Sequence, residues 1–316
     1  MSHPVQLDAG QIFSGKSSGT MIFGYDAPSE YTPSIDPNYL FHESSRDVIV
    51  WFLMQNPEPL YICGPTSAGK SSLIRQIAAR LNYPVFEATG HDRVEFPDLV
   101  GHLSVQNGNM VFEDGPLTLA MKIGGIFLFN EADLCSPATL AGLNTILDGS
   151  PLCIAENGGE LVKPSPMFRF IVTANSNGNS DETGLYQGVM RQNIAFMDRF
   201  MLVEMGYPKP EVERDLLIRM FPEIPAEITE KMVDFANDVR RNFMGNSSAH
   251  DALEVTLSTR TLIRWARLTI AFQPLSRQGI SPIMYALDRA LGFRASTTSR
   301  AALHEMAQRI FPSISN

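Results

Sequence analysis

A glycine-rich run before a helix-like segment carries the clearest chemistry in the sequence. Residues 64–71 fit the pattern G-x-x-x-x-G-K-[ST], follow the apolar stretch Leu60–Cys63 and precede the helix-like residues 72–81. In such a loop the backbone N–H groups turn toward phosphates, Lys70 reaches the β/γ oxygens, and the Ser71 hydroxyl can ligate Mg²⁺. The sequence therefore predicts a site for ATP and Mg²⁺. Its phosphate-binding residues are Gly64, Pro65, Thr66, Ser67, Ala68, Gly69, Lys70, Ser71 and Ser72.

Amide and acidic residues follow a second apolar run. Gly125–Phe129 is typical of a buried strand, and Asn130, Glu131 and Asp133 come after it. Because ligands of open α/β sheets bind at the carboxyl ends of the strands, we expect these side chains beside the phosphate loop. Glu131 is the candidate that polarises the attacking water. Asn130 stands where P-loop enzymes normally carry the aspartate that holds Mg²⁺, so we assign it, with Ser71, to the metal site.

Asn130 departs from that pattern. An amide lacks a full negative charge, and its hydrogen bond to a metal-bound water is weaker by about a factor of two. We therefore expect ATP turnover to be slow. In the alternative interpretation, Asn130 or Asp133 only caps a helix.

A third polar side chain ends the next predicted strand. Arg169–Ala174 is apolar apart from its ends, and Asn175 follows it. Parallel strands end at the same edge of a sheet, so Asn175 is expected next to Glu131. There it would orient the nucleophilic water or sense the γ-phosphate.

These residues require a sheet that brings several strand ends together. Strand and helix signals alternate along Asp47–Met54, Tyr61–Cys63, 71–81, Val85–Ala88, Leu117–Met121, Gly125–Phe129, Pro137–Leu147, Arg169–Ala174 and Met201–Met205. This alternation predicts an α/β fold with a doubly wound parallel sheet. After Pro210 apolar residues recur at helical spacing. We therefore predict an irregular N-terminal arm at 1–45, a P-loop core at 46–207 and a smaller all-helical domain at 208–316.

Two short hairpins interrupt the alternation. Asn107–Asn109 separates two strand-like segments, and so does Glu156–Gly159. Asn-Gly supplies the positive φ angles that a tight hairpin turn requires. Taken singly, each is an ordinary surface hairpin.

Composition narrows the class of protein. The 316 residues carry a net charge of −9, which disfavours a nucleic-acid partner. No apolar run approaches the roughly 20 residues that span a bilayer, and the first residues lack a signal-peptide pattern, so neither a membrane nor export is expected. The three cysteines form no C-x-x-C pair, which indicates reduced thiols in a cytoplasmic protein.

The order of phosphate loop, acidic strand end and polar strand end, with both hairpins, resembles the AAA+ ATPases. The chain is most similar to the MoxR branch, and within it to the cobaltochelatase small ATPase subunits (CobS) and the CbbQ/NorQ activators. The resemblance covers about residues 22–272. The matching stretches are Tyr31–Phe41, the phosphate loop with Gln76–Asn82, Phe96–Gly101, Thr173–Asn175, Thr183–Tyr186, Met197–Phe200 and Ser258–Thr261.

The resemblance implies roles for three further residues. Asn175 would be the first sensor, and Arg199 the arginine finger that reaches a neighbouring subunit's nucleotide. Arg260 would be the second sensor, carried on a helical lid. The alternatives are a surface salt bridge for Arg199 and a solvated helix N-terminus for Arg260.

The resemblance also implies an assembly. A finger supplied in trans requires a homo-oligomer, and the family's usual form is a hexameric ring whose hairpins face the pore or a partner. Such ATPases typically act as chaperones or metal-insertion motors with a von Willebrand factor A domain protein. Its D-x-S-x-S pattern is absent from this sequence, so the partner would be a separate chain. The alternative functions are a nucleic-acid-linked AAA+ ring and a slow, nucleotide-gated assembly scaffold.

From Gln273 onward the resemblance gives no firm correspondence. Pro282–Leu291 and Thr298–Ile310 are expected to be helices whose apolar faces pack the lid.

Overall fold

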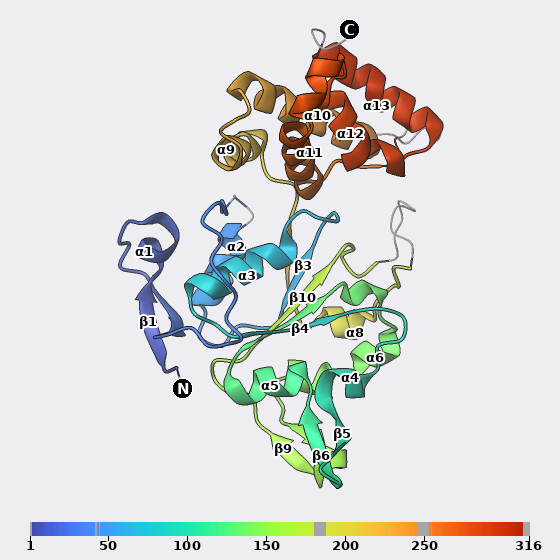
Figure 1. The fold of residues 1–316 in the computed structure, drawn as a ribbon. Coiled ribbons are helices and arrows are strands. Elements are labelled where there is room, and N and C mark those ends of the chain that lie inside the picture. Colours follow the sequence, from blue (N-terminus) through green and yellow to red (C-terminus); the bar gives the residue numbers. More distant parts are fainter. Residues whose placement is uncertain are drawn as a thin grey trace. The chain divides into compact units, whose positions relative to one another are not determined.

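The computed structural model describes residues 2–41, 43, 45–179, 188–244, 253 and 255–311 (Figure 1). The chain forms two compact units. The first contains Met1–Pro37, Glu43–Pro65 and Gly69–Gly206; the second contains Asn38–His42, Thr66–Ala68 and Tyr207–Asn316. In the described ranges, no helix has both the length and the apolar character to cross a membrane. The motif Thr183–Tyr186 lies outside the described residues.

Five parallel strands form the central sheet of the first unit. They are β3 (Leu60–Cys63), β4 (Val85–Thr89), β7 (Ile126–Asn130), β10 (Arg169–Ala174) and β11 (Met201–Glu204). The order is β11-β3-β10-β7-β4, and each neighbouring pair is parallel. Every residue of β3, β7 and β10 is buried, as expected for parallel strands that are covered on both faces. The predicted α/β fold is confirmed.

Short helices connect and cover these strands. They are α2 (Ser45–Leu53), α3 (Lys70–Arg80), α4 (Phe96–Val100), α5 (Pro116–Ile123), α6 (Pro137–Ala141), α7 (Asn144–Leu147) and α8 (Ile194–Met197). Figure 1 shows α3 on one side of the sheet and α5 on the other. Because β3, β10 and β7 are neighbouring parallel strands, their carboxyl ends lie side by side at one edge of the sheet, and α3 begins at this edge.

The prediction of one helix over residues 137–147 is wrong. The chain turns at Gly142 and Leu143, which separate α6 from α7. Glycine inside a helix is about 1 kcal/mol less favourable than alanine. A Cβ at Gly142 would lie 3.1 Å from the ring of Phe96, so this turn also packs closely against α4.

The prediction of an irregular arm is wrong for residues 4–25. β1 (Pro4–Asp8) pairs antiparallel with β2 (Met21–Tyr25), and α1 (Ala9–Ser14) lies between them. Asp8 orders the connection because its carboxylate accepts hydrogen bonds from the N–H groups of Gln11, Ser18 and Gly19. These bonds hold the pKa of Asp8 well below its usual value, the Ser17 hydroxyl contributing most.

Both predicted hairpins are confirmed. β5 (Gly101–Gln106) pairs with β6 (Asn109–Asp114), and β8 (Leu152–Ile154) pairs with β9 (Glu160–Val162). Asn107 has φ 51° and Gly108 φ 80°, the positive angles that the first turn requires. Lys122 on α5 joins the two hairpins, since its ammonium lies 2.8 Å from Asp114 and 2.9 Å from Glu160.

The second unit is helical after Tyr207. Its α-helices are α9 (Pro210–Met220), α10 (Ala226–Met244), α11 (Thr259–Ala271), α12 (Pro282–Ala290) and α13 (Thr297–Ile310). Trp265 is fully buried at its centre, against Phe235 and Phe311. The two predicted C-terminal helices are confirmed as α12 and α13, and their buried residues pack this core.

Candidate nucleotide site at the sheet edge

The phosphate loop joins β3 to α3 and takes backbone angles that favour glycine. Gly64 has φ 147° and Gly69 φ 99°, and Ser67 between them has φ 58°. A Cβ at Gly64 would lie 2.0 Å from the carbonyl oxygen of Met205, so no side chain fits there. Such a turn aims successive N–H groups into one concavity, and α3 adds the positive end of its dipole.

Lys70 is buried at the start of α3. Its ammonium donates to the carbonyls of Gly64 (2.8 Å) and Pro65 (3.0 Å) and to Asn175 Oδ1 (3.0 Å), all neutral acceptors. Burial lowers the pKa of Lys70 to about 8, and the negative charges of Asp133 and Glu131 only partly oppose this shift. The site therefore holds a cation whose charge lacks a direct counter-ion among these contacts.

Ser71 and Asn130 meet at the neighbouring strand end. Ser71 Oγ donates to Asn130 Oδ1 at 2.5 Å, and Thr173 Oγ1 on β10 donates to the same oxygen at 3.1 Å. Asn130 itself is only 9% exposed. The two residues predicted to face Mg²⁺ are thus brought together.

Glu131 follows Asn130 in a left-handed conformation with φ 54° and ψ 39°. For a non-glycine residue this geometry costs about 1–2 kcal/mol, and such residues cluster at functional sites. The Glu131 side chain is exposed and makes no hydrogen bond to the part of the chain that is described. Its carbonyl lies so close to Gly90 that a Cβ there would be 2.4 Å from the oxygen.

Asp133 fixes the end of β10. Its Oδ2 accepts from the backbone N–H groups of Asn175 (2.8 Å) and Ser176 (3.0 Å), and its side chain is fully buried. The second carboxylate oxygen, Oδ1, is buried without a partner among the described residues. The helix-cap alternative is wrong for both Asn130 and Asp133, because Glu131 precedes the short 3₁₀ turn and Ser136 caps α6.

Arg199 forms the salt bridge named above as its alternative. Nε and Nη2 lie 2.8 Å and 3.0 Å from the carboxylate of Asp148, and Nη1 donates to the carbonyl of Ala195. Asp148 is half exposed. In the single chain, therefore, Arg199 is held on its own surface.

Arg260 lies in the first turn of α11. Its side chain is exposed, and no hydrogen bond joins it to another described residue. Ser258 caps this helix by accepting from the N–H of Thr261.

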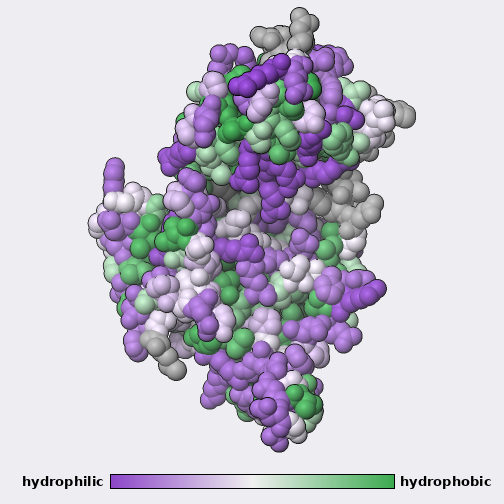
Figure 2. Space-filling view, in the orientation of Figure 1, coloured by the Kyte–Doolittle hydropathy of each residue, from purple (hydrophilic) through white to green (hydrophobic). Residues whose placement is uncertain are grey.

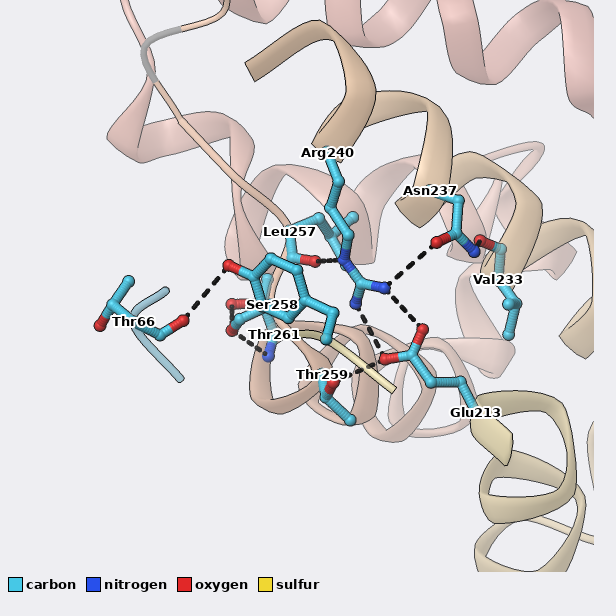
Figure 3. A network of polar contacts seen from close by, with 10 residues as sticks. Thr66, Glu213, Val233, Asn237, Arg240, Leu257, Ser258, Thr259 and Thr261 are labelled. Atoms are coloured by element: carbon cyan, nitrogen blue, oxygen red, sulfur yellow. Dashed lines mark hydrogen bonds and ion pairs between the residues drawn. The ribbon is translucent and has the colours of Figure 1, made fainter. Parts of the chain in front are cut away.

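A buried ion pair anchors that helix start within the second unit (Figure 3). Arg240 binds Glu213 through two hydrogen bonds of 2.7 and 2.9 Å, and the side chains are 3% and 0% exposed. Thr259 also donates to Glu213, and Arg240 Nε donates to the carbonyl of Leu257. The Arg240 guanidinium stacks 4.4 Å from the ring of Tyr207.

The phosphate loop with Lys70, Ser71 and Asn130 fits a nucleotide with Mg²⁺. The concave loop and the buried ammonium suit phosphate oxygens, and a hydroxyl and an amide oxygen suit a magnesium ion that keeps several waters. Among the described residues no group of three or more His, Cys, Asp or Glu side chains could hold a metal, so a separate metal centre is not indicated in that part of the chain.

The structure joins Lys70 to Asn175 and Ser71 to Asn130 by hydrogen bonds, and Glu131 follows Asn130 in sequence. It leaves Arg199 and Arg260 outside this network. Sequence reasoning placed Asp133 at this edge but did not predict its hydrogen bonds to the backbone of Asn175 and Ser176. It missed Gly90, which lies against the Glu131 carbonyl, and Glu87, which accepts from the Asn130 amide, because these contacts depend on which strands are neighbours.

Comparison with known proteins identifies related chains. The family model "AAA domain (dynein-related subfamily)" matches residues 59–200, and "CbbQ/NirQ/NorQ C-terminal" matches residues 213–310. Aerobic cobaltochelatase subunit CobS of a Sinorhizobium species is 30% identical over 98% of this chain and 95% of its own length. Denitrification regulatory protein NirQ of Stutzerimonas stutzeri is 29% identical over 81% of this chain and 82% of its own length. Protein NorQ of Paracoccus denitrificans is 27% identical over 82% of this chain and 86% of its own length.

Proposed function

The chain belongs to the MoxR-like AAA+ ATPases that include CobS, NorQ and CbbQ, and from this premise we propose that it is a ring motor which acts on a target through a partner protein. ATP hydrolysis follows from the family. The observation that carries the proposal is the contact of Lys70 and Ser71 with two polar strand ends. The proposed domains are an arm at 1–45, a core at 46–207 and a lid at 208–316.

The proposed chemistry assigns one task to each side chain. The loop N–H groups and Lys70 bind the phosphates, Glu131 polarises the attacking water, and Asn175 orients it or senses the γ-phosphate. Ser71 and Asn130 would hold Mg²⁺, which when bound neutralises charge on the β- and γ-oxygens. Lys70 already contacts Asn175, so a phosphate that binds Lys70 changes the surroundings of the sensor.

A ring is proposed because Arg199 and Arg260 are outside the network of the single chain. Arg199 would leave Asp148 and reach the nucleotide of a neighbouring subunit, and Arg260 on the lid would complete the site as the second sensor. We propose a hexamer in the cytoplasm, where ATP and Mg²⁺ are available.

The hairpins are proposed as the surface for the partner, a separate von Willebrand factor A domain protein. Val105 and Met110 face each other across β5 and β6 and are 70% and 64% exposed, and Leu161 on β9 is 64% exposed. Figure 2 shows hydrophobic atoms at this end of the first unit. The output would be chaperone-like remodelling or metal insertion; CobS, by its name, belongs to a cobaltochelatase.

The test measures ATP turnover and oligomer mass together for wild type and three variants. Glu131→Gln should keep the ring and lower turnover by about 10²–10⁴-fold, as for loss of a general base. Arg199→Ala should lower it by about 10³-fold or more. Arg241→Ala, which removes another surface arginine paired with an aspartate, is the control and should change neither. A monomer that hydrolyses ATP unaffected by Arg199→Ala would contradict the ring.

Asn130 favours one second candidate, a slow nucleotide-gated scaffold. The scaffold hypothesis predicts that the ring assembles when ATP binds, while the wild-type protein hydrolyses ATP no faster than Glu131→Gln. A nucleic-acid-linked ring is less favoured because the hairpins present Glu113, Asp114 and Glu160, and Lys122 beside them is already paired.

A further inference from the structure

Asn130 has a carboxylate partner on the adjacent strand. Its Nδ2 donates to Glu87 Oε2 at 3.0 Å, while its Oδ1 accepts from Ser71 and Thr173. Glu87 lies on β4, which pairs directly with β7. Every polar atom of the Asn130 side chain is therefore used.

A second charge holds Glu87 in place. Arg75 on α3 binds it in a two-pronged pair, with Nε 2.6 Å from Oε1 and Nη2 2.5 Å from Oε2. The planar guanidinium fixes the plane of the carboxylate as well as its position. α3 begins with Lys70 and Ser71, so one helix supplies both the hydroxyl and the clamp.

The chemistry of the partners determines which way the amide points. A carboxylate paired with arginine accepts hydrogen bonds, so the Asn130 group that faces Glu87 is the NH₂. Asn130 Oδ1 must then face Ser71, the hydroxyl next to Lys70. Without Glu87 the two ends of the amide would compete for that position.

We propose that Glu87 is a positioning residue: held by Arg75, its carboxylate keeps Asn130 Oδ1 directed at the Mg²⁺ side of the site. The inference rests on the proposed nucleotide site.

The proposal makes a prediction for Asn130→Asp, the variant that restores the aspartate which P-loop enzymes normally carry at this position. Asn130→Asp would put a second carboxylate about 3 Å from Glu87, and like charges so close disfavour each other. Glu87→Gln combined with Asn130→Asp returns one acid and one amide to the pair. The double variant should therefore recover what each single variant loses.

The experiment measures binding of a fluorescent ADP analogue with EDTA and across a Mg²⁺ titration, and Mn²⁺ binding by electron paramagnetic resonance. Glu87→Gln should weaken metal affinity by about 10- to 100-fold, as for other partners of metal-site residues, and leave EDTA affinity unchanged. Asn130→Asp should also weaken it, and the double variant should match wild type. Glu227→Gln, which breaks an exposed i,i+4 pair, is the control.

Two results would overturn the proposal. One is Glu87→Gln with wild-type metal affinity; the other is a double variant whose loss is the sum of the single losses. If wild type binds no nucleotide even in EDTA, the proposed nucleotide site fails and this inference fails with it, a pattern distinct from the first two.

Discussion

Lys70 in the first unit and Arg240 in the second are both buried cations, and their direct contacts are opposite in kind. Arg240 in the helical unit meets the carboxylate of Glu213 through two hydrogen bonds, and a third residue, Thr259, binds the same acid. Lys70 in the phosphate loop meets two carbonyls and an amide oxygen. The first charge is neutralised by a direct ion pair; the direct contacts of the second are neutral dipoles, and the carboxylates of Asp133 and Glu131 act on it only from a distance.

The difference separates structural charge from functional charge. A buried pair with complete hydrogen bonds fixes how helices pack, here α9, α10 and the start of α11. Lys70, buried at the phosphate loop with only neutral groups in direct contact, is placed to meet an anionic ligand, and its burial lowers its pKa.

The largest expected effect comes from breaking the Arg240 pair. Arg240→Met leaves Glu213 buried and unpaired, so the free energy of unfolding should fall by about 3–5 kcal/mol. Replacing Arg240, Glu213 and Thr259 together by Met, Leu and Val should recover most of the loss. Chemical denaturation measures the free energy of unfolding of both variants. The control is Arg241→Met, which replaces an exposed arginine and should change that free energy by less than about 0.5 kcal/mol. A small effect of Arg240→Met would remove the contrast with Lys70.

Sequence reasoning predicted the features that have local signals and missed the contacts that depend on strand pairing. The phosphate loop, the parallel strands and both hairpins were predictable because glycine spacing, apolar runs and Asn-Gly turns are local signals. The β1–β2 hairpin was missed because its pairing joins segments separated by α1 and has no tight-turn signal. The roles of Glu87 and Asp133 depend on β7 lying between β4 and β10, and local sequence does not give strand order.

Asp133 links the unpaired lysine to the strand end. Asp133→Asn keeps one oxygen that accepts from the N–H groups of Asn175 and Ser176, but these hydrogen bonds no longer end on a charged carboxylate. We therefore expect the free energy of unfolding to fall by about 1–2 kcal/mol. If Asp133 also offsets the burial of Lys70, the loss should shrink in a Lys70→Met background. A double-mutant cycle by denaturation measures this coupling, and strict additivity would argue against it.

Glu131 tests whether the site stores backbone strain. Asparagine tolerates the left-handed conformation better than glutamine, so Glu131→Asn should be about 1 kcal/mol more stable than Glu131→Gln. Both should bind ATP and neither should hydrolyse it. Thermal melts with a turnover assay measure the pair, and equal stability would show that the conformation carries no strain.

A pH dependence follows from the lowered pKa of Lys70. The pKa of Lys70, about 8 in the fold against 10.5 normally, means that the unfolded chain binds more protons between these values. The unfolding free energy of the nucleotide-free protein should therefore rise with pH in that window. Nucleotide binding should take up about half a proton at pH 8, measured by calorimetry in buffers of different ionisation enthalpy. Binding heats that are independent of buffer would contradict a lowered pKa.

The most direct test of the contrast is the thermal unfolding midpoint of Lys70→Met with and without Mg·ADP, beside wild type. We predict that the free variant is at least as stable as wild type, because it removes a buried charge that has no counter-ion in direct contact. We also predict that it gains none of the stabilisation, about 2.7 kcal/mol at a hundredfold excess over Kd, that Mg·ADP gives wild type. A free variant several degrees less stable than wild type, or one stabilised equally by Mg·ADP, would show that Lys70 holds the fold rather than the nucleotide.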